Sequence, residues 1–322
     1  MALSFLLCAA LIAVEPNASQ AAAQATSPEV AAARAVVERS LPFIIAGGQD
    51  WIANKNCVSC HRVGPMVWSL RAAAERGFAV DRKQLQGWVD WSLDSLFDES
   101  DKKVTGAGAA VNADGLSQLL LGLSTEQLAA KDRERLTKQI VAVRRPDGSW
   151  KPEGQLPGQK RPGAETTAVS TMWQTLALLS ETPSGKPSPA SMAEEVDAAV
   201  STEWWVVRLV LSHRRGDATE TNRARGELLQ QQREDGGWGW LREDESDALA
   251  TGMALYALGD SGLDGRDSAI ARAWKFLAEA QRPDGGWDVR GTKKAKQKNV
   301  EETASYWGAT WAVIGIVQTL PD

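Results

Sequence analysis

The segment Cys57-Val58-Ser59-Cys60-His61 has the most specific chemistry in the chain. Two thiols three positions apart can add to the two vinyl groups of one haem, and the adjacent imidazole can bind the iron as its proximal ligand. The spacing therefore predicts one covalent haem c per chain, attached to Cys57 and Cys60, with His61 on the iron. A disulfide between the two cysteines, a redox dithiol and half of a zinc site remain as alternatives.

The cysteine and histidine counts favour haem over zinc. The sequence has three cysteines and two histidines. Cys8 lies in the N-terminal apolar stretch, so the remaining chain has only Cys57 and Cys60, and its other histidine is His213. A zinc site would need more thiol or imidazole ligands than these residues supply.

Residues 1–23 have the pattern of a secretory signal peptide, although no Lys or Arg precedes the apolar stretch Leu3–Val14. We therefore expect a bacterial protein that is secreted or periplasmic. No later stretch is apolar enough for a membrane helix, so we do not expect an integral membrane protein. The formal net charge of -5 argues against a nucleic-acid partner, which would need a basic face.

A short repeat organises the rest of the sequence. The segment 232–238 (QREDGGW) recurs at 281–287 (QRPDGGW), 49 positions later, and 144–150 (RRPDGSW) is a third copy. Each copy follows a helical pattern and precedes a second, more apolar one. Asp-Gly-Gly favours a turn, because glycine allows a positive φ. Two helices in a period of about 50 residues predict a helical repeat array.

Six helix pairs can be counted in this way. The second helix of each pair is the more apolar and opens with an acidic or Thr residue, as helix starts often do. The fourth pair, expected at Met192–Val200 and Glu203–His213, has lost its Gly-Trp turn. Six pairs close an all-α (α/α)6 toroid, which we expect over residues 28–322, with the haem motif in its first helix pair.

The repeat copies resemble the QW repeats of squalene-hopene cyclases, and the layout resembles the prenyltransferase/squalene-cyclase α/α-toroid superfamily. The resemblance covers residues 28–322. It implies that the Trp and Gln side chains of the repeats tie neighbouring outer helices together. The residues that would have this structural role are Trp150, Gln232, Trp238, Gln281 and Trp287.

A second resemblance includes the haem motif. The segments Leu41-Pro42-Phe43 and Val67-Trp68-Ser69-Leu70, with Trp51 between them, are similar to a group of secreted bacterial proteins that put a haem c motif into the first turn of such a toroid. We therefore expect a c-type haem protein for electron transfer or for redox or ligand sensing. Its expected partners are haem, a redox protein and an apolar ligand in the toroid lumen. The alternatives are a terpenoid-cyclase-like or haem-dependent, peroxidase-like enzyme, and a non-catalytic binding scaffold.

The cyclase resemblance also suggests catalytic candidates. Squalene-hopene cyclases protonate a double bond with an Asp of an Asp-x-Asp-Asp-Thr-Ala motif, and the nearest string here is 299–304, with Glu301 and Glu302. Acidic residues also open the other expected inner helices, where they favour the helix dipole. Because those cyclases have two toroid domains and a longer chain, the sequence favours no terpene cyclase activity. Glu301 and Glu302 are therefore weak candidates.

Two methionines are candidates for the distal iron ligand. Met172 and Met253 lie about two turns into expected inner helices, or about 10 Å from the haem-side mouth at a rise of 1.5 Å per residue. Methionine at such positions also fills hydrophobic cores, and we favour an open iron site over a Met ligand. The basic run 293–298 (KKAKQK) is expected to be a solvated loop near the same mouth.

Overall fold

The computed structural model describes residues 27–55, 58, 61–97, 112–123, 126–153, 158–181, 196 and 198–322. Within these ranges the chain forms eleven α-helices and no strand. None of these helices combines the length and apolar character needed to cross a bilayer. The predicted signal peptide, residues 1–23, lies outside the described residues, and secretion stays a prediction.

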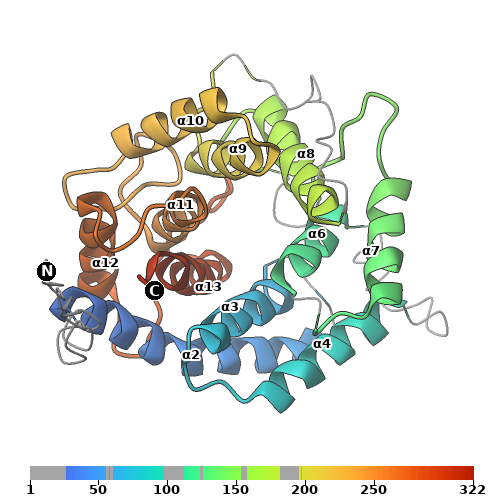
Figure 1. Cartoon of the computed structure of the whole chain (residues 1–322), viewed down its shortest axis with the longest axis horizontal. Helices are drawn as coiled ribbons and strands as arrows, with labels where there is room; N and C mark the ends of the chain where they lie inside the picture. Colours follow the sequence, from blue (N-terminus) through green and yellow to red (C-terminus); the bar gives the residue numbers. More distant parts are fainter. Residues whose placement is uncertain are drawn as a thin grey trace, which may run out of the picture.

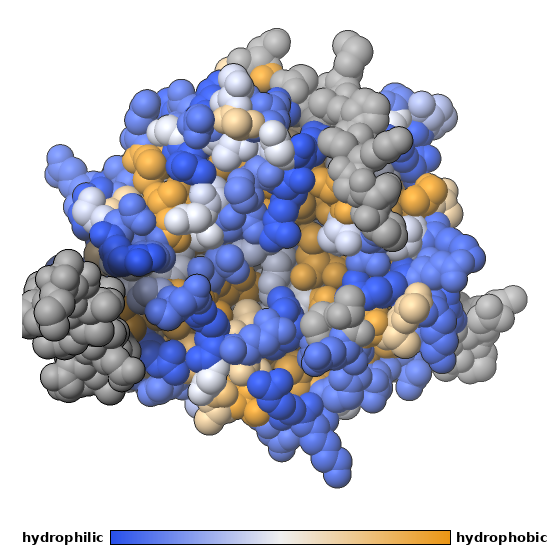
Figure 2. Space-filling model, viewed as in Figure 1, coloured by the Kyte–Doolittle hydropathy of each residue, from blue (hydrophilic) through white to orange (hydrophobic). Residues whose placement is uncertain are grey.

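Six helices form a closed inner ring (Figure 1). In chain order they are α3 (Val63–Glu75), α6 (Ala113–Gly122), α8 (Gly163–Ser180), α9 (Thr202–Arg215), α11 (Ala248–Asp260) and α13 (Glu302–Thr319). Each inner helix packs against the next, and α13 packs against α3 to close the ring. Figure 2, in the same view, shows hydrophilic residues around the rim and hydrophobic ones between them toward the centre.

Outer helices cover this ring. They are α2 (Pro28–Lys55), α4 (Arg82–Phe97), α7 (Ala130–Ala142), α10 (Ala218–Gln230) and α12 (Ser268–Ala280). The outer helix expected at Met192–Val200 lies mostly outside the described residues, and its described end, 198–200, is not helical. The prediction of an all-α toroid is confirmed, and the fold is a squalene-cyclase-like α/α toroid.

The sequence pattern of each helix explains its layer. In the outer helix α12 the buried side chains recur at helical spacing, so that one face packs inward and the other meets solvent. In the inner helix α11 every residue from Ala248 to Leu258 is buried. Inner helices α11 and α13 approach closely at Gly252, where an added Cβ would lie 2.3 Å from the carbonyl carbon of Trp311. A larger residue there would force the two helices apart.

The repeat tryptophans fasten each turn to the helix that precedes it. The indole Nε1 groups donate to a main-chain carbonyl ten positions earlier, at 2.7 Å for Trp150 to Ile140, 2.8 Å for Trp238 to Leu228 and 2.9 Å for Trp287 to Leu277. All three indoles are buried. The tryptophans therefore hold a turn to its own outer helix.

The repeat glutamines make the links between neighbouring outer helices. Gln232 Nε2, after α10, donates to the Ala269 carbonyl of α12 at 2.7 Å. Gln281 Nε2, after α12, donates to the Val36 carbonyl of α2 at 3.1 Å and to Ser40 Oγ at 2.9 Å. Gln281 thus joins the last outer helix to the first.

Replacing Gln281 by alanine is expected to lower the free energy of unfolding by about 1–3 kcal/mol. The change leaves the buried Ser40 hydroxyl and the Val36 carbonyl with fewer hydrogen bonds. Urea denaturation measures the effect. Gln297→Ala, in an exposed loop, is the control, and an equal loss in both variants would contradict the proposed link.

Candidate functional site

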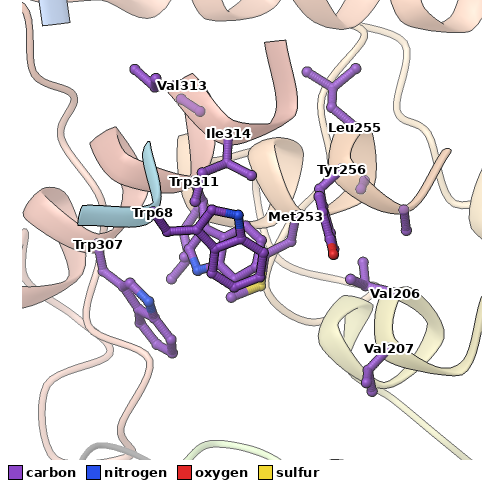
Figure 3. Packing of buried hydrophobic residues seen from close by; sticks show 14 of the residues in the cluster. Trp68, Val206, Val207, Met253, Leu255, Tyr256, Trp307, Trp311, Val313 and Ile314 are labelled. Atoms are coloured by element: carbon purple, nitrogen blue, oxygen red, sulfur yellow. The ribbon is translucent and has the colours of Figure 1, made fainter. Parts of the chain in front are cut away.

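Aromatic side chains from four inner helices meet inside the ring. They are Trp68 of α3, Trp173 of α8, Tyr256 of α11 and Trp311 of α13, called here the aromatic cluster. The Trp311 ring centroid lies 5.4 Å from that of Trp68, 5.6 Å from Tyr256 and 5.9 Å from Trp173. Figure 3 shows Trp68, Tyr256 and Trp311 from close by. Because α8 and α13 are not neighbours in the ring, the contact between Trp173 and Trp311 spans the lumen.

A buried ion pair adjoins the aromatic cluster. Arg161 Nη1 donates to Glu203 Oε2 at 2.7 Å, and neither side chain is more than 2% exposed. The other carboxylate oxygen of Glu203 accepts from Trp173 Nε1 at 3.1 Å. Glu203 lies in the first turn of α9, where the helix dipole favours a negative charge. The pair therefore links the N-terminal ends of helices α8 and α9 to the aromatic cluster.

Asp114, in the first turn of α6, is a buried carboxyl group. Its Oδ1 accepts from Ser170 Oγ and from Gln174 Nε2, both at 2.7 Å, and its Oδ2 accepts from the Glu153 amide at 3.0 Å. Burial, helped by the negative charge of Glu203, raises the pKa of Asp114 from 3.8 to about 6 against these hydrogen bonds. Asp114 can therefore hold a proton at near-neutral pH.

Asp247 is a second carboxyl group at the start of an inner helix, and it is half-buried. It caps α11 by accepting from the Ala250 amide at 2.8 Å. Burial raises the pKa of Asp247 to about 6, although the Lys160 charge acts in the opposite direction. Both acidic groups stand at the start of an inner helix, so they lie at the same end of the ring.

Two loops cross this end of the ring. Residues 158–161 precede α8 and residues 292–298 precede α13; together they are called the strap. The Lys160 amide donates to the Thr292 carbonyl at 2.9 Å, and the Lys294 amide donates to the Gly158 carbonyl at 3.0 Å. Since α8 and α13 are not adjacent, the strap bridges two sides of the ring. The basic run 293–298 lies within it, and its lysines from Lys294 on are exposed.

A pocket of about 350 Å³ lies at the opposite end of the ring. Leucines from the ends of α6 and α8, with Val210 and Tyr256, form its apolar walls, and Arg133, Glu181 and Arg214 are polar groups in its lining. Tyr256 belongs to both the pocket and the aromatic cluster. The cluster therefore lies between this pocket and the acidic end of the ring.

The predicted haem site falls only partly on described residues. Cys57 and Cys60 lie outside them. His61 is buried, with its ring centroid 5.2 Å from that of Trp51. Burial, followed by the charges of Arg62 and Lys293, lowers the pKa of His61 to about 3, so its imidazole is neutral at pH 7.

Both candidates for the distal iron ligand are core methionines. Met172 and Met253 are fully buried in the hydrophobic core. Among the described residues, no group of three or more His, Cys, Asp or Glu side chains could hold a metal ion. Haem attachment and a distal Met ligand stay predictions.

The weak catalytic candidates have roles at the start of α13. Glu301 is the N-cap and accepts from the Ala304 amide at 3.1 Å. Glu302 pairs with Arg62, and its side chain is 74% exposed. The sequence interpretation missed Asp114, Arg161 and Glu203. The sequence signals Asp114 and Glu203 only as acidic residues at the start of inner helices, and it gives no signal for Arg161.

Part of the chain is similar to known proteins. A family model described as the squalene-hopene cyclase N-terminal domain matches residues 192–287. A drimenyl diphosphate synthase from Streptantibioticus cattleyicolor is 42% identical over 76 residues, and one from Streptomyces showdoensis is 36% identical over 77. Each match covers 24% of this chain and 14% of the relative.

A solved structure from Salmonella enterica, described as a possible member of the GH105 family, also aligns with the chain. It is 12% identical, with a TM-score of 0.48, over 80% of this chain and 81% of that one.

These relatives correct the main functional prediction. The prediction of a cytochrome-like protein for electron transfer or redox sensing is wrong, because the matched relatives are named drimenyl diphosphate synthase and the matched family model describes a squalene-hopene cyclase domain. The interpretation given as an alternative, a terpenoid-cyclase-like enzyme, is the better supported one.

Proposed function

We propose that this protein is a terpenoid-cyclase-like enzyme that encloses a linear isoprenoid in its toroid and closes a ring after protonating a double bond. The aromatic cluster is the observation that carries the proposal. Its four rings come from four inner helices and pack against one another in a buried, largely apolar interior. Aromatic faces stabilise cations, and carbocations are the intermediates of such a reaction.

Asp114 is the proton donor in this proposal. It belongs to an inner helix and bonds two residues of α8, Ser170 and Gln174, which flank Trp173 in the sequence. When its proton passes to an isoprenoid double bond, the Ser170, Gln174 and Glu153 donors stabilise the carboxylate that remains. Their prior arrangement means that no reorganisation is needed during proton transfer.

The remaining steps need no co-reactant. The carbocation formed by protonation is attacked by the π electrons of a second double bond of the same chain, which forms a carbon–carbon bond and moves the positive charge. Loss of a proton from a carbon next to the final cation restores a double bond. The product is therefore an isomer of the substrate, with no change in oxidation state. A closed interior protects the cation from water.

The matched relatives support this proposal. The segment that resembles the squalene-hopene cyclase domain, 192–287, includes Glu203, Asp247 and Tyr256. Because the matched relatives share only 14% of their length with this chain, the activity of this chain is inferred from its own residues together with that resemblance.

A solvent-isotope assay tests the proposed reaction. The protein is incubated in D₂O with linear C15 and C30 isoprenoids, and the products are separated by gas chromatography with mass detection. We expect a cyclic isomer that carries one deuterium, because the acid exchanges its proton for deuterium in D₂O and transfers the deuteron to carbon, which forms a C–D bond. Absence of a cyclic product with every isoprenoid, or a cyclic product without deuterium, would overturn the proposal.

A further inference from the structure

Among the buried N–H donors at the acidic end of the ring that have no hydrogen-bond acceptor within the described residues, three lie close together. They are Arg161 Nη2, Trp240 Nε1 and Trp307 Nε1. The residues are 2%, 1% and 3% exposed. The guanidinium carbon of Arg161 lies 5.4 Å from the Trp240 ring centroid, and the Trp240 and Trp307 centroids are 6.1 Å apart. The three donors therefore belong to one contiguous group of side chains.

Leaving such donors unpaired is costly. A buried N–H without an acceptor costs about 1–3 kcal/mol, and folded proteins leave few of them. Arg161 is well ordered by its other bonds, because Nε donates to Thr166 Oγ1 and Nη1 donates to Ser201 Oγ and Glu203 Oε2. One arm of the guanidinium fork is fully used and the other is unbonded. A ligand with an acceptor atom would satisfy it.

The charges around the group favour a neutral acceptor. Arg161 is paired with Glu203, Lys160 with Asp244 at 2.6 Å, and Arg62 with Glu302. The strap lysines that follow Lys293 are exposed and add no charge to the buried region. A phosphate brought here would bury a negative charge among cations that already have carboxylate partners, and half-buried Lys293 of the strap would have to offset its desolvation alone. A hydroxyl or carbonyl oxygen has no such cost.

We propose that Arg161, Trp240 and Trp307 form a binding site for a neutral oxygen, a hydroxyl or carbonyl group, at one end of the isoprenoid. This inference rests on the proposed function and names the class of substrate, an oxygenated isoprenoid. The hydrogen bonds from Arg161 to Glu203 and from Trp173 to Glu203 connect the site to the aromatic cluster. The oxygen end of the ligand thus lies beneath the strap, and its hydrocarbon chain extends along the aromatic rings.

Matched ligands test the site by binding alone. Isothermal titration calorimetry compares a linear C15 prenyl alcohol with the hydrocarbon that lacks its oxygen and with its monophosphate. We expect the alcohol to bind at least about 10-fold more tightly than either of the others, because only the alcohol pairs the donors without burying a net charge.

Two variants remove one donor each while keeping an aromatic ring. Trp240→Phe and Trp307→Phe are expected to weaken alcohol binding by about 2–10-fold and to leave hydrocarbon binding unchanged. Trp88→Phe, half-buried on the outer helix α4, is the matched control. Arg161 is kept, because its removal would leave Glu203 as an unpaired buried charge.

The outcomes separate this site from the proposed function. Equal affinity for alcohol and hydrocarbon, tighter binding of the monophosphate, or unchanged alcohol affinity in both variants would overturn the site. None of these results depends on turnover. Selective alcohol binding without any cyclic product would uphold the site and overturn the cyclase proposal alone.

Discussion

Asp114→Asn is expected to slow cyclisation of a linear isoprenoid by about 10²–10⁴-fold, the usual contribution of a positioned general acid. Asparagine has nearly the same shape and keeps one oxygen that can accept from Ser170 and Gln174, but it has no acidic proton. Initial rates of formation of the deuterated cyclic product measure the effect. Circular dichroism confirms that the variant is folded.

Two further variants make the assignment specific. Asp90→Asn, exposed on α4, should keep the wild-type rate. Asp247→Asn removes the other carboxyl group whose pKa is raised to about 6. If Asp114→Asn retained more than half of the wild-type rate, Asp114 would have no role as the acid. A large loss in Asp247→Asn alone would transfer that role to Asp247.

Asp114 and Asp247 should also make the protein less stable as pH rises from about 4 to 7. The pKa of each is 3.8 in the unfolded chain and about 6 in the fold. In this window the unfolded chain has lost its protons while the folded chain still holds them. The stabilisation is therefore complete below pH 3.8 and is lost as pH rises through 6. Each group accounts for the loss of about 3 kcal/mol of the free energy of unfolding.

Urea denaturation between pH 4.5 and 7.5 measures this loss. Asp114→Asn mimics the neutral carboxyl group, so the difference in unfolding free energy between wild type and variant should fall with rising pH by up to about 3 kcal/mol. Asp247→Asn should give a similar trend, and Asp90→Asn should give none. A difference that stays constant with pH would show that Asp114 ionises in the fold as it does in the unfolded chain.

The architecture could be predicted because its signals are local and repeated. Each Trp of a repeat bonds a carbonyl ten positions earlier, so the same seven-residue turn recurs wherever that bond is made. The alternation of amphipathic and wholly apolar helices separated the outer layer from the inner one. The fourth pair was harder to predict, because it lacks the turn that marks the others.

The site could not be predicted in the same way, because its contacts are between distant segments. Asp114 looks like an ordinary helix start, and only the fold brings Ser170 and Gln174 onto its oxygens. Arg161 stands in a loop that reads as polar and solvated, yet its guanidinium is buried against Glu203. By contrast, every residue of the haem-attachment pattern lies within the five positions 57–61. The sequence therefore predicts a haem protein from this local motif, whereas the site around Asp114 and Arg161 can be recognised only in the folded structure.

The way the ring closes has a consequence for biosynthesis. Helix α13 packs on α2, α3 and α11, and Tyr306 Oη donates to the Ile44 carbonyl, 262 positions earlier in the chain. Contacts of such sequence separation form late and slowly. During translation α2, α3 and α11 emerge first, with the faces that α13 will cover still open to solvent. We therefore expect the nascent chain to expose apolar faces that chaperones bind until Glu302–Thr319 has left the ribosome, and a chain that stops before α13 should aggregate.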